Sequence, residues 1–316
     1  MKYAPDATIS ELLPRHQGPE HSRLPESEPS LDILSRPQPP EGARFRYGRE
    51  PSQFAELRIP TGSGPHPVVV GIHGGWWRAA HGLETHAHLC HALTEAGFAT
   101  WNIEYRRLGE PGHSWLQTLE DTGSAIDYLE RIAHDYALDL GRIVTLGFSA
   151  GGQLALWAAA RPRLPLGHPL RTPAALAVKS GISLAGAVDL ARCAELRLSD
   201  DVVSEFLAGD IAAVPQHFAQ SSPIEFLPLG VPQVLIHGTA DTSVPHEISE
   251  RYAAAARDCH DDCELILLHG TGHFALIDPL SPAWDAVLNA VVRSSAPVYR
   301  PAGFVSTTVQ RTEKEL

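Results

Sequence analysis

Ser149 lies in a short glycine-rich stretch whose residue types suit a nucleophile. The stretch GFSAG at 147–151 has the pattern G-x-S-x-G. The apolar run RIVTLGF at 142–148 leads into the serine, and the helix-like run GQLALWAAA leads out of it. A serine at such a strand–turn–helix junction exposes its hydroxyl beside a helix N-terminus, which favours negative charge. We predict Ser149 as an acyl-transfer nucleophile; the alternative is a glycine-rich turn with an incidental serine.

A serine hydroxyl needs a base within hydrogen-bond reach, and the base needs an orienting partner. At a serine site of this kind the chain order is serine, acid, histidine. Asp241 follows the apolar run PQVLIHG at 232–238, and His273 follows the run CELILLHG at 263–270. Three residues in this order beyond predicted strands indicate a Ser-His-Asp triad. For Asp241 alone, the alternative is a cap for the helix that starts near Pro245.

Other histidines compete with His273 for the role of base, since the chain has 17 of them. His237 and His269 fall at the ends of predicted strands, where a neutral core histidine is the common case. His246 is a further competitor. The position of His273 in the loop after the last predicted strand favours it as the base.

Acyl transfer by a serine also needs donors aimed at the developing oxyanion, and removing one donor often costs about 3 kcal/mol. One donor is predicted to be the backbone N–H of Ala150, directly after the serine. The others are expected in HGGWW at 73–77, which directly follows the run VVVGI. Glycines there let the backbone approach a substrate closely. We assign these donors to Gly75 and Trp76, with Gly74 as the near alternative.

Aromatic side chains near these motifs are candidates for the wall of a substrate pocket. Trp76, Trp77, Phe148 and Trp115 are expected to line an apolar pocket that suits aromatic groups. For Trp77 and Trp115 the alternative is ordinary core packing. His73 is expected to hold the glycine loop by hydrogen bonds to the backbone, or to be a core histidine.

Short apolar runs alternate with longer amphipathic segments along the chain. From FAELRIP onward, strands are predicted at 67–73, 98–105, 142–148, 180–186, 232–238 and 263–270, and helices near 82–96, 115–136, 150–161, 246–257 and 279–293. This order predicts an α/β fold with a mostly parallel, doubly wound sheet and helices on both faces. Residues 187–230 interrupt the alternation, and we interpret them as a small insertion over the carboxyl edge of the sheet.

The two ends of the chain differ in composition from its middle. Residues 1–44 contain several prolines and are predicted to form an irregular arm, and the polar residues 295–316 a flexible tail. Residues 45–294 are predicted to form the catalytic domain. The arm could lie over this domain. Either the arm or the tail could also mediate a homodimer.

The composition of the 316-residue chain is that of a soluble globular protein, with 43% hydrophobic and 20% charged residues. A net charge of −12 argues against binding to nucleic acid or anionic membranes. The chain has neither a signal-peptide run nor the roughly 18 apolar residues of a membrane span, so a cytoplasmic location is expected. The four cysteines are too few for a disulfide framework, and CHDDC at 259–263 lacks a second ligand pair, so no metal is expected.

Five motifs in chain order carry a resemblance to a known family: HGGWW, EYRRLGE, GFSAGG, HGTADTSVP and GTGHF. Together they resemble the α/β-hydrolase superfamily over about residues 45–293. The chain looks like its HGGXW esterase branch, which includes arylformamidases (kynurenine formamidases) and relatives of feruloyl and hormone-sensitive-lipase-type esterases. The resemblance implies a hydrolase without metal or organic cofactor, in which Ser149 is the nucleophile, His273 the base and Asp241 its partner.

Departures from the hormone-sensitive-lipase pattern favour the HGGXW branch. Phe148 stands where many of those esterases have an acidic residue, and Trp76 where they tend to have a third glycine. Glu104 and Arg106 are expected to form a structural ion pair. We therefore predict hydrolysis of a short-chain or aromatic carboxylic ester, a small molecule, through an acyl-enzyme. The alternatives are hydrolysis of an N-formyl aromatic amine and binding of a ligand without turnover.

Overall fold

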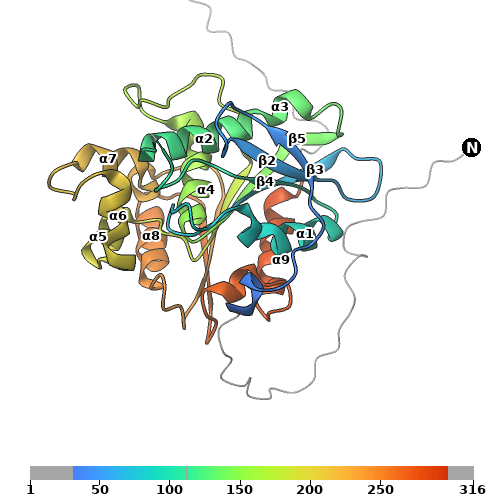
Figure 1. The fold of residues 1–316 in the computed structure, drawn as a ribbon. Coiled ribbons are helices and arrows are strands. Elements are labelled where there is room, and N and C mark those ends of the chain that lie inside the picture. The colour runs from blue at the N-terminus through green and yellow to red at the C-terminus, as the bar shows by residue number, and fades with distance from the viewer. Residues whose placement is uncertain (1–30, 112, 298–316) are drawn as a thin grey trace, which may run out of the picture.

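The computed structural model describes residues 31–111 and 113–297, which fold around one central sheet (Figure 1). Its strands are β1 (Ala43–Arg46), β2 (Phe54–Arg58), β3 (His66–Ile72), β4 (Ala99–Ile103), β5 (Leu138–Phe148), β6 (Ser180–Leu184), β7 (Gln233–Gly238) and β8 (Cys263–Leu268). Their order across the sheet is β1-β2-β4-β3-β5-β6-β7-β8. The pairs β1–β2 and β2–β4 are antiparallel, and all other neighbours are parallel. The prediction of a mostly parallel α/β sheet is confirmed.

Helices connect the strands. The α-helices are α1 (Ala87–Glu95), α2 (Trp115–Asp127), α3 (Leu129–Ile132), α4 (Ala150–Ala160), α5 (Leu190–Glu195), α6 (Leu198–Leu207), α7 (Pro215–Ser221), α8 (Glu247–Asp258) and α9 (Trp284–Ser295). The 3-10 helices are η2 (Leu31–Leu34), η3 (Leu83–His86), η4 (Arg161–Arg163), η5 (Pro223–Phe226) and η6 (Phe274–Ile277). In the part of the chain that the structure describes, no helix has both the length and the apolar character needed to cross a bilayer.

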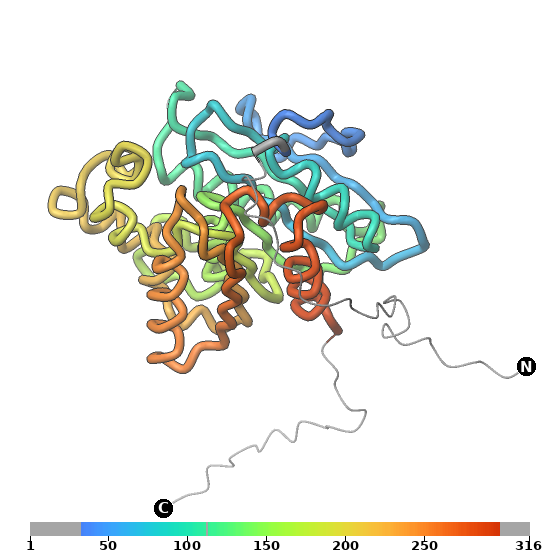
Figure 2. The backbone as a smooth tube through the Cα atoms, turned by 90° about the horizontal axis from the view of Figure 1, so that it is seen from below, coloured from blue at the N-terminus to red at the C-terminus, as the bar shows by residue number. Residues whose placement is uncertain are grey.

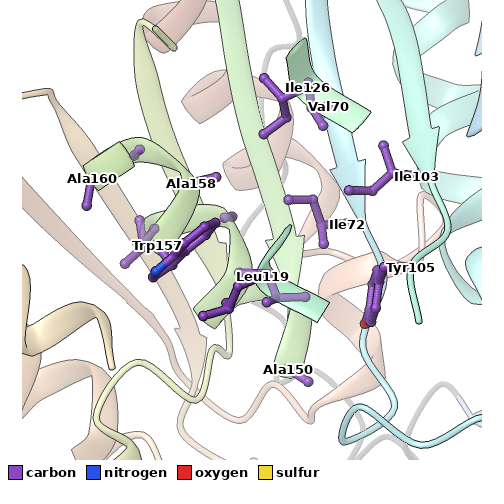
Figure 3. Packing of buried hydrophobic residues seen from close by; sticks show 14 of the residues in the cluster. Val70, Ile72, Ile103, Tyr105, Leu119, Ile126, Ala150, Trp157, Ala158 and Ala160 are labelled. Atoms are coloured by element: carbon purple, nitrogen blue, oxygen red, sulfur yellow. The ribbon is translucent and has the colours of Figure 1, made fainter. Parts of the chain in front are cut away.

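The apolar runs of the strands are continuous because helices cover both faces of the sheet. Along β3, Val68 and Val70 belong to one buried cluster with α2, α4 and α8, whereas Val69 belongs to a second cluster with α1 and α9. Every residue of α4 is buried, since this helix lies between the sheet and α2. Figure 3 shows Trp157 of α4 and Leu119 of α2 in the first cluster. This packing fixes the β5–α4 junction, where Ser149 lies.

The predicted insertion at 187–230 forms α5, α6, α7 and η5 between β6 and β7. These helices project from one side of the molecule (Figures 1 and 2). Phe206 of α6 stacks on Trp77, which follows β3, with ring centroids 4.4 Å apart. The insertion therefore covers part of the loop that leaves the carboxyl end of β3.

Part of the predicted N-terminal arm belongs to the folded body. Ile33 of η2 is buried in the same cluster as Leu276 and Ile277 of η6, and β1 begins at Ala43, before the boundary that the sequence suggested. The predictions for residues 1–30 and 298–316 fall outside the described residues. The arm is thus packed against the fold from η2 onward.

Candidate active site

Ser149 occupies a strained turn between β5 and α4. Its backbone angles are φ 56° and ψ −121°, a region that side-chain-bearing residues rarely adopt. The turn is tight: a methyl group at Gly147 would collide with the carbonyl oxygen of Gly151, and one at Gly151 with that of Ile72. The Ser149 N–H donates to the carbonyl of Leu184 on β6 at 2.8 Å. The glycines of the motif are therefore needed to place this serine at the carboxyl edge of the sheet.

Asp241 and His273 meet in the loops that follow β7 and β8. The distance from His273 Nδ1 to Asp241 Oδ2 is 2.6 Å. Asp241 Oδ1 accepts hydrogen bonds from the N–H groups of Ser243 and Val244, both at 2.8 Å. Asp241 therefore makes the turn contacts of a cap and also holds the histidine. With Nδ1 directed at the carboxylate, Nε2 of His273 is left for a proton transfer.

His237 is a second histidine on the same carboxylate, and sequence reasoning treated it only as a core residue. It is fully buried, with Nε2 lying 2.9 Å from the Val244 carbonyl oxygen and 3.3 Å from Asp241 Oδ2. Because both neighbours are acceptors, Nε2 carries the proton, and Nδ1 accepts from the Ser249 hydroxyl at 2.7 Å. His237 thus positions Asp241. The spacing of four residues between His237 and Asp241 is the feature of the sequence that could have indicated this contact.

The environment of Asp241 keeps this carboxylate ionised. Burial would raise the pKa of Asp241, but hydrogen bonds from His237, His273 and the Val244 N–H outweigh burial and hold the pKa well below its usual range. An ionised Asp241 can orient His273 through this contact and can stabilise an imidazolium at that position.

The lowered pKa of Asp241 should appear in the pH dependence of stability. The unfolded-state pKa of Asp is about 3.9, so the stabilisation is complete above that value and is lost as pH falls from about 4 through the lower folded-state pKa. We expect the difference in free energy of unfolding between wild type and Asp241→Asn to shrink as pH falls from about 5 to 3. Urea titrations across this range measure it; a constant difference down to pH 3 would contradict this account.

The loop after β3 passes directly beside the nucleophile. A methyl group at Gly74 would lie 2.8 Å from the Phe148 carbonyl oxygen and 2.9 Å from Ser149 Cβ. Gly75 and Trp76 have φ values of 105° and 52°. Among the described residues, the N–H groups of Gly74, Gly75 and Trp76 have no hydrogen-bond acceptor. Free donors at this place suit an oxyanion.

A further free donor lies on the other side of the nucleophile. Ala150 is the first residue of α4, so its N–H has no acceptor within the helix. The N-terminus of α4 also carries partial positive charge. The N–H groups of Gly74, Gly75, Trp76 and Ala150 are thus without a backbone acceptor on the two sides of Ser149.

His73 holds the glycine loop from beneath. Its Nδ1 lies 2.7 Å from the Gly74 carbonyl oxygen, and its Nε2 lies 2.8 Å from Glu104 Oε1. The ring stacks on Tyr105, whose hydroxyl donates to the His73 carbonyl at 2.8 Å. His73 is therefore both a buried residue and a support of the backbone that could bind an oxyanion.

The expected Glu104–Arg106 ion pair is not what the structure shows. Glu104 pairs with His73 and with Arg107, at 3.2 Å, whereas Arg106 pairs with Asp121 at 2.6 Å. Burial raises the pKa of Glu104, and His73 and Arg107 more than reverse this effect. The two side chains diverge because Glu104 points beneath the glycine loop and Arg106 towards α2.

Ser149 and His273 line the same small cavity, whose volume is about 80 Å³. The cavity is also lined by Leu34, Gly74, Gly75, Trp76, His81, Thr85, Phe148, Ser243 and Phe274. Trp76 and Phe148 thus lie where the sequence placed them. Leu34 lies in none of the motifs, and Phe274, although it ends the GTGHF motif, had not been assigned to the pocket.

Trp77 and Trp115 do not line this cavity. Trp77 is fully buried, donates from Nε1 to Gln153 at 3.1 Å and stacks on Phe206. Trp115 packs against His217, with ring centroids 5.0 Å apart. The positive φ of Trp76 and Trp77 turns the chain sharply, so that the second indole enters the core. Both residues are therefore packed in the core, which was the stated alternative to lining the pocket.

The remaining sequence candidates have structural roles or lie at the surface. His269 is exposed, contrary to the expectation of a core histidine, because the chain turns at the end of β8. His246 faces Glu250 at 3.3 Å. Within CHDDC, Asp261 accepts hydrogen bonds from the N–H groups of Leu229 and Gly230. It thereby joins the end of the insertion to the turn before β8.

The family profile of BD-FAE matches residues 57–255, which is more than half of the chain. The chain belongs to the BD-FAE family. This family consists of α/β-hydrolase esterases, which confirms the resemblance to that superfamily.

Curated relatives of this BD-FAE chain carry esterase names. It is 25% identical over 257 residues to a probable isoprenylcysteine alpha-carbonyl methylesterase, ICME, of Oryza sativa subsp. japonica, covering 78% of this chain and 61% of that protein. It is 29% identical over 231 residues to the carboxylesterase NlhH of Mycobacterium tuberculosis, covering 67% and 69%. The chain spans 54–61% of the length of the plant methylesterases it matches first.

Solved structures similar to this BD-FAE chain include an esterase of Thermogutta terrifontis, Est2, with propionate bound. Its TM-score is 0.66 at 22% identity, covering 80% of this chain and 93% of that one. The same organism's esterase 2 phosphonylated by sarin has a TM-score of 0.68 at 21% identity, covering 83% and 98%. These similarities establish the esterase fold.

Proposed function

We propose that this protein is a serine hydrolase that cleaves a small carboxylic ester through an acyl-enzyme. The observation that carries the proposal is the 2.6 Å contact between His273 Nδ1 and the ionised Asp241, at a cavity that Ser149 also lines. Nucleophile, base and orienting acid thus occupy one edge of one sheet. The esterase names of the curated relatives support an ester as the substrate.

The first half of the proposed reaction forms the acyl-enzyme. Ser149 Oγ attacks the ester carbonyl carbon as Nε2 of His273 accepts the hydroxyl proton. The carbonyl oxygen becomes negative and accepts hydrogen bonds from the N–H of Ala150 and those of Gly75 and Trp76, with Gly74 as the neighbouring donor. The carbon–oxygen bond to the alcohol then breaks, and His273 returns the proton to the leaving alkoxide.

The second half of the reaction releases the acid. A water molecule gives a proton to His273 and attacks the acyl carbon, and the bond to Ser149 Oγ breaks as the serine regains the proton. Asp241 stays ionised throughout and stabilises the imidazolium in each half. His237 acts through Asp241 and touches no reacting atom.

Covalent labelling tests the proposal directly. A fluorophosphonate probe should add to Ser149 alone, and hydrolysis of p-nitrophenyl acetate should be lost in proportion to the label, as measured by peptide mass spectrometry. Ser243 lines the same cavity, so Ser243→Ala is the informative control and should still be labelled. A label on Ser243, or full activity after complete labelling, would contradict the proposal. Assaying an N-formyl aromatic amine beside p-nitrophenyl acetate tests the alternative reaction, in which the leaving group is an amine.

A further inference from the structure

A segment near the N-terminus forms part of the wall of the proposed acyl site. Leu34, the last residue of η2, lines the cavity together with Ser149 and Phe274 and is 37% exposed. Its neighbour Ile33 is 1% exposed and packs with Leu276 in the cluster beside η6. Figure 1 shows this blue segment beside the orange-red elements that precede α9. Leu34 is therefore anchored from one side and faces the cavity on the other.

An ion pair joins this segment to the opposite part of the wall. Nη1 and Nη2 of Arg36 donate to the two carboxylate oxygens of Asp278 at 2.7 and 2.8 Å. Asp278 directly follows η6, whose first residue, Phe274, also lines the cavity. Two parallel charge-assisted hydrogen bonds fix distance and orientation together. The pair thus holds Leu34 and Phe274 at a set separation.

The side chain of Asp278 is well suited to be this anchor. It is 4% exposed, and its Oδ1 also accepts from the Leu280 N–H at 2.9 Å. Burial raises the pKa of Asp278, but the hydrogen bonds from Arg36 and the Leu280 N–H reverse the effect and keep the carboxylate charged. A buried, charged and fully paired carboxylate resists displacement, since breaking the pair would strand its charge.

The volume that this wall leaves is small. The cavity measures about 80 Å³, whereas an engineered apolar cavity of about 150 Å³ holds one benzene molecule. Pockets for drug-sized ligands begin at roughly 300 Å³. The space beside Ser149 is therefore of a size that suits a short acyl group such as acetyl or propionyl.

We propose that Leu34, held in place by the Arg36–Asp278 ion pair, limits the acyl group of the substrate to acetyl or propionyl size. The inference rests on the proposed ester hydrolysis at Ser149. Removing the Leu34 side chain opens the cavity towards solvent and lets a longer acyl chain extend along the space that the leucine filled.

The test compares p-nitrophenyl acetate, butyrate, hexanoate and octanoate on wild type and Leu34→Ala. Each methylene group of the acyl chain that becomes buried should change kcat/KM by about fourfold. Burial of two methylene groups in the space that Leu34 leaves should therefore raise kcat/KM for hexanoate relative to acetate by roughly 15-fold. The gain should come mainly from KM, because the reacting groups are untouched.

Three further variants make the test specific. Leu166→Ala makes the same change at a leucine that is 84% exposed and does not line the cavity, so its acyl profile should equal that of wild type. Leu34→Phe should narrow the cavity and lower the rate for p-nitrophenyl propionate, which the wild type is expected to accept, relative to acetate. Asp278→Asn should weaken the ion pair and shift the profile in the same direction as Leu34→Ala.

The outcomes separate this inference from the proposed function. Unchanged acyl profiles in Leu34→Ala and Leu34→Phe, with acetate hydrolysis and fluorophosphonate labelling of Ser149 intact, would overturn the role of Leu34 alone. A wild type that hydrolyses none of the esters and is not labelled at Ser149 would overturn both proposals. If Leu34→Ala does not fold, the decrease expected for propionate in Leu34→Phe tests the inference, and an unchanged ratio of propionate to acetate would overturn it.

Discussion

Replacement of Ser149 by alanine should lower kcat for ester hydrolysis by on the order of 10⁴- to 10⁶-fold. The variant loses the atom that bonds to the acyl carbon, and only the oxyanion donors and substrate binding remain to assist attack by water. The loss should appear in kcat and not in KM, since the cavity walls are unchanged. Because alanine tolerates a positive φ no better than serine, thermal stability should change little.

Ser183→Ala is the matched control for this experiment. Ser183 lies on β6, is fully buried and does not line the cavity, and its hydroxyl has no hydrogen-bond partner among the described residues. Its removal should leave kcat unchanged. Initial rates at saturating p-nitrophenyl acetate give kcat for the wild type and both variants. If Ser149→Ala kept more than about a hundredth of wild-type kcat, a different group would have to be the nucleophile.

Asp241→Asn should lower kcat by about 10⁴-fold without loss of the fold. The N–H groups of Ser243 and Val244 both point at Oδ1, so the amide oxygen of the asparagine must take that place. The amide NH₂ then takes the place of Oδ2 and faces His273 Nδ1. His273 is forced to accept at Nδ1 and to carry its proton on Nε2. In that tautomer it has no lone pair for the proton of Ser149.

Asp189→Asn makes the same chemical change at another buried carboxylate. Asp189 accepts from the Arg192 N–H and pairs with Arg251 at 3.0 Å, and it does not line the cavity. Its replacement should reduce stability while kcat of the folded protein stays near that of wild type. Stopped-flow acylation and steady-state kcat, both corrected for folded fraction, compare the two variants. Equal losses of kcat would mean that the orienting acid has been misassigned.

Much of the fold could be predicted from the sequence because its signals are local. Each strand from β3 to β8 contains a short apolar run, and each run except that of β6 is followed by a segment with helical periodicity. Because Ser149, Asp241 and His273 each follow a strand, the sequence places them at the carboxyl edge of the sheet even when no particular contact is known. β1 and β2 were missed as strands: β1, with the sequence ARFR, alternates at an exposed edge, and β2, with the sequence FAELR, is interrupted by charged residues.

Contacts between distant segments could not be predicted in the same way. The adjacent residues Trp76 and Trp77 have the same side chain, yet a turn with positive φ sends one to the cavity and the other to Phe206. The partner of Glu104 depends on the position of His73, and no periodicity encodes that. Leu34 was unpredictable for a related reason, because a proline-rich arm carries no sign of where it packs.

The enclosure of Gly147 and Gly151 has a consequence for how this enzyme can be diversified. Backbone atoms surround both positions, so a mutagenesis library gains nothing there. Leu34 is different: it borders the cavity while about a third of it remains in solvent, and a larger or smaller side chain has room to adjust. New substrate ranges are therefore accessible from the edge of the fold, through residues that can be exchanged without disturbing the nucleophile.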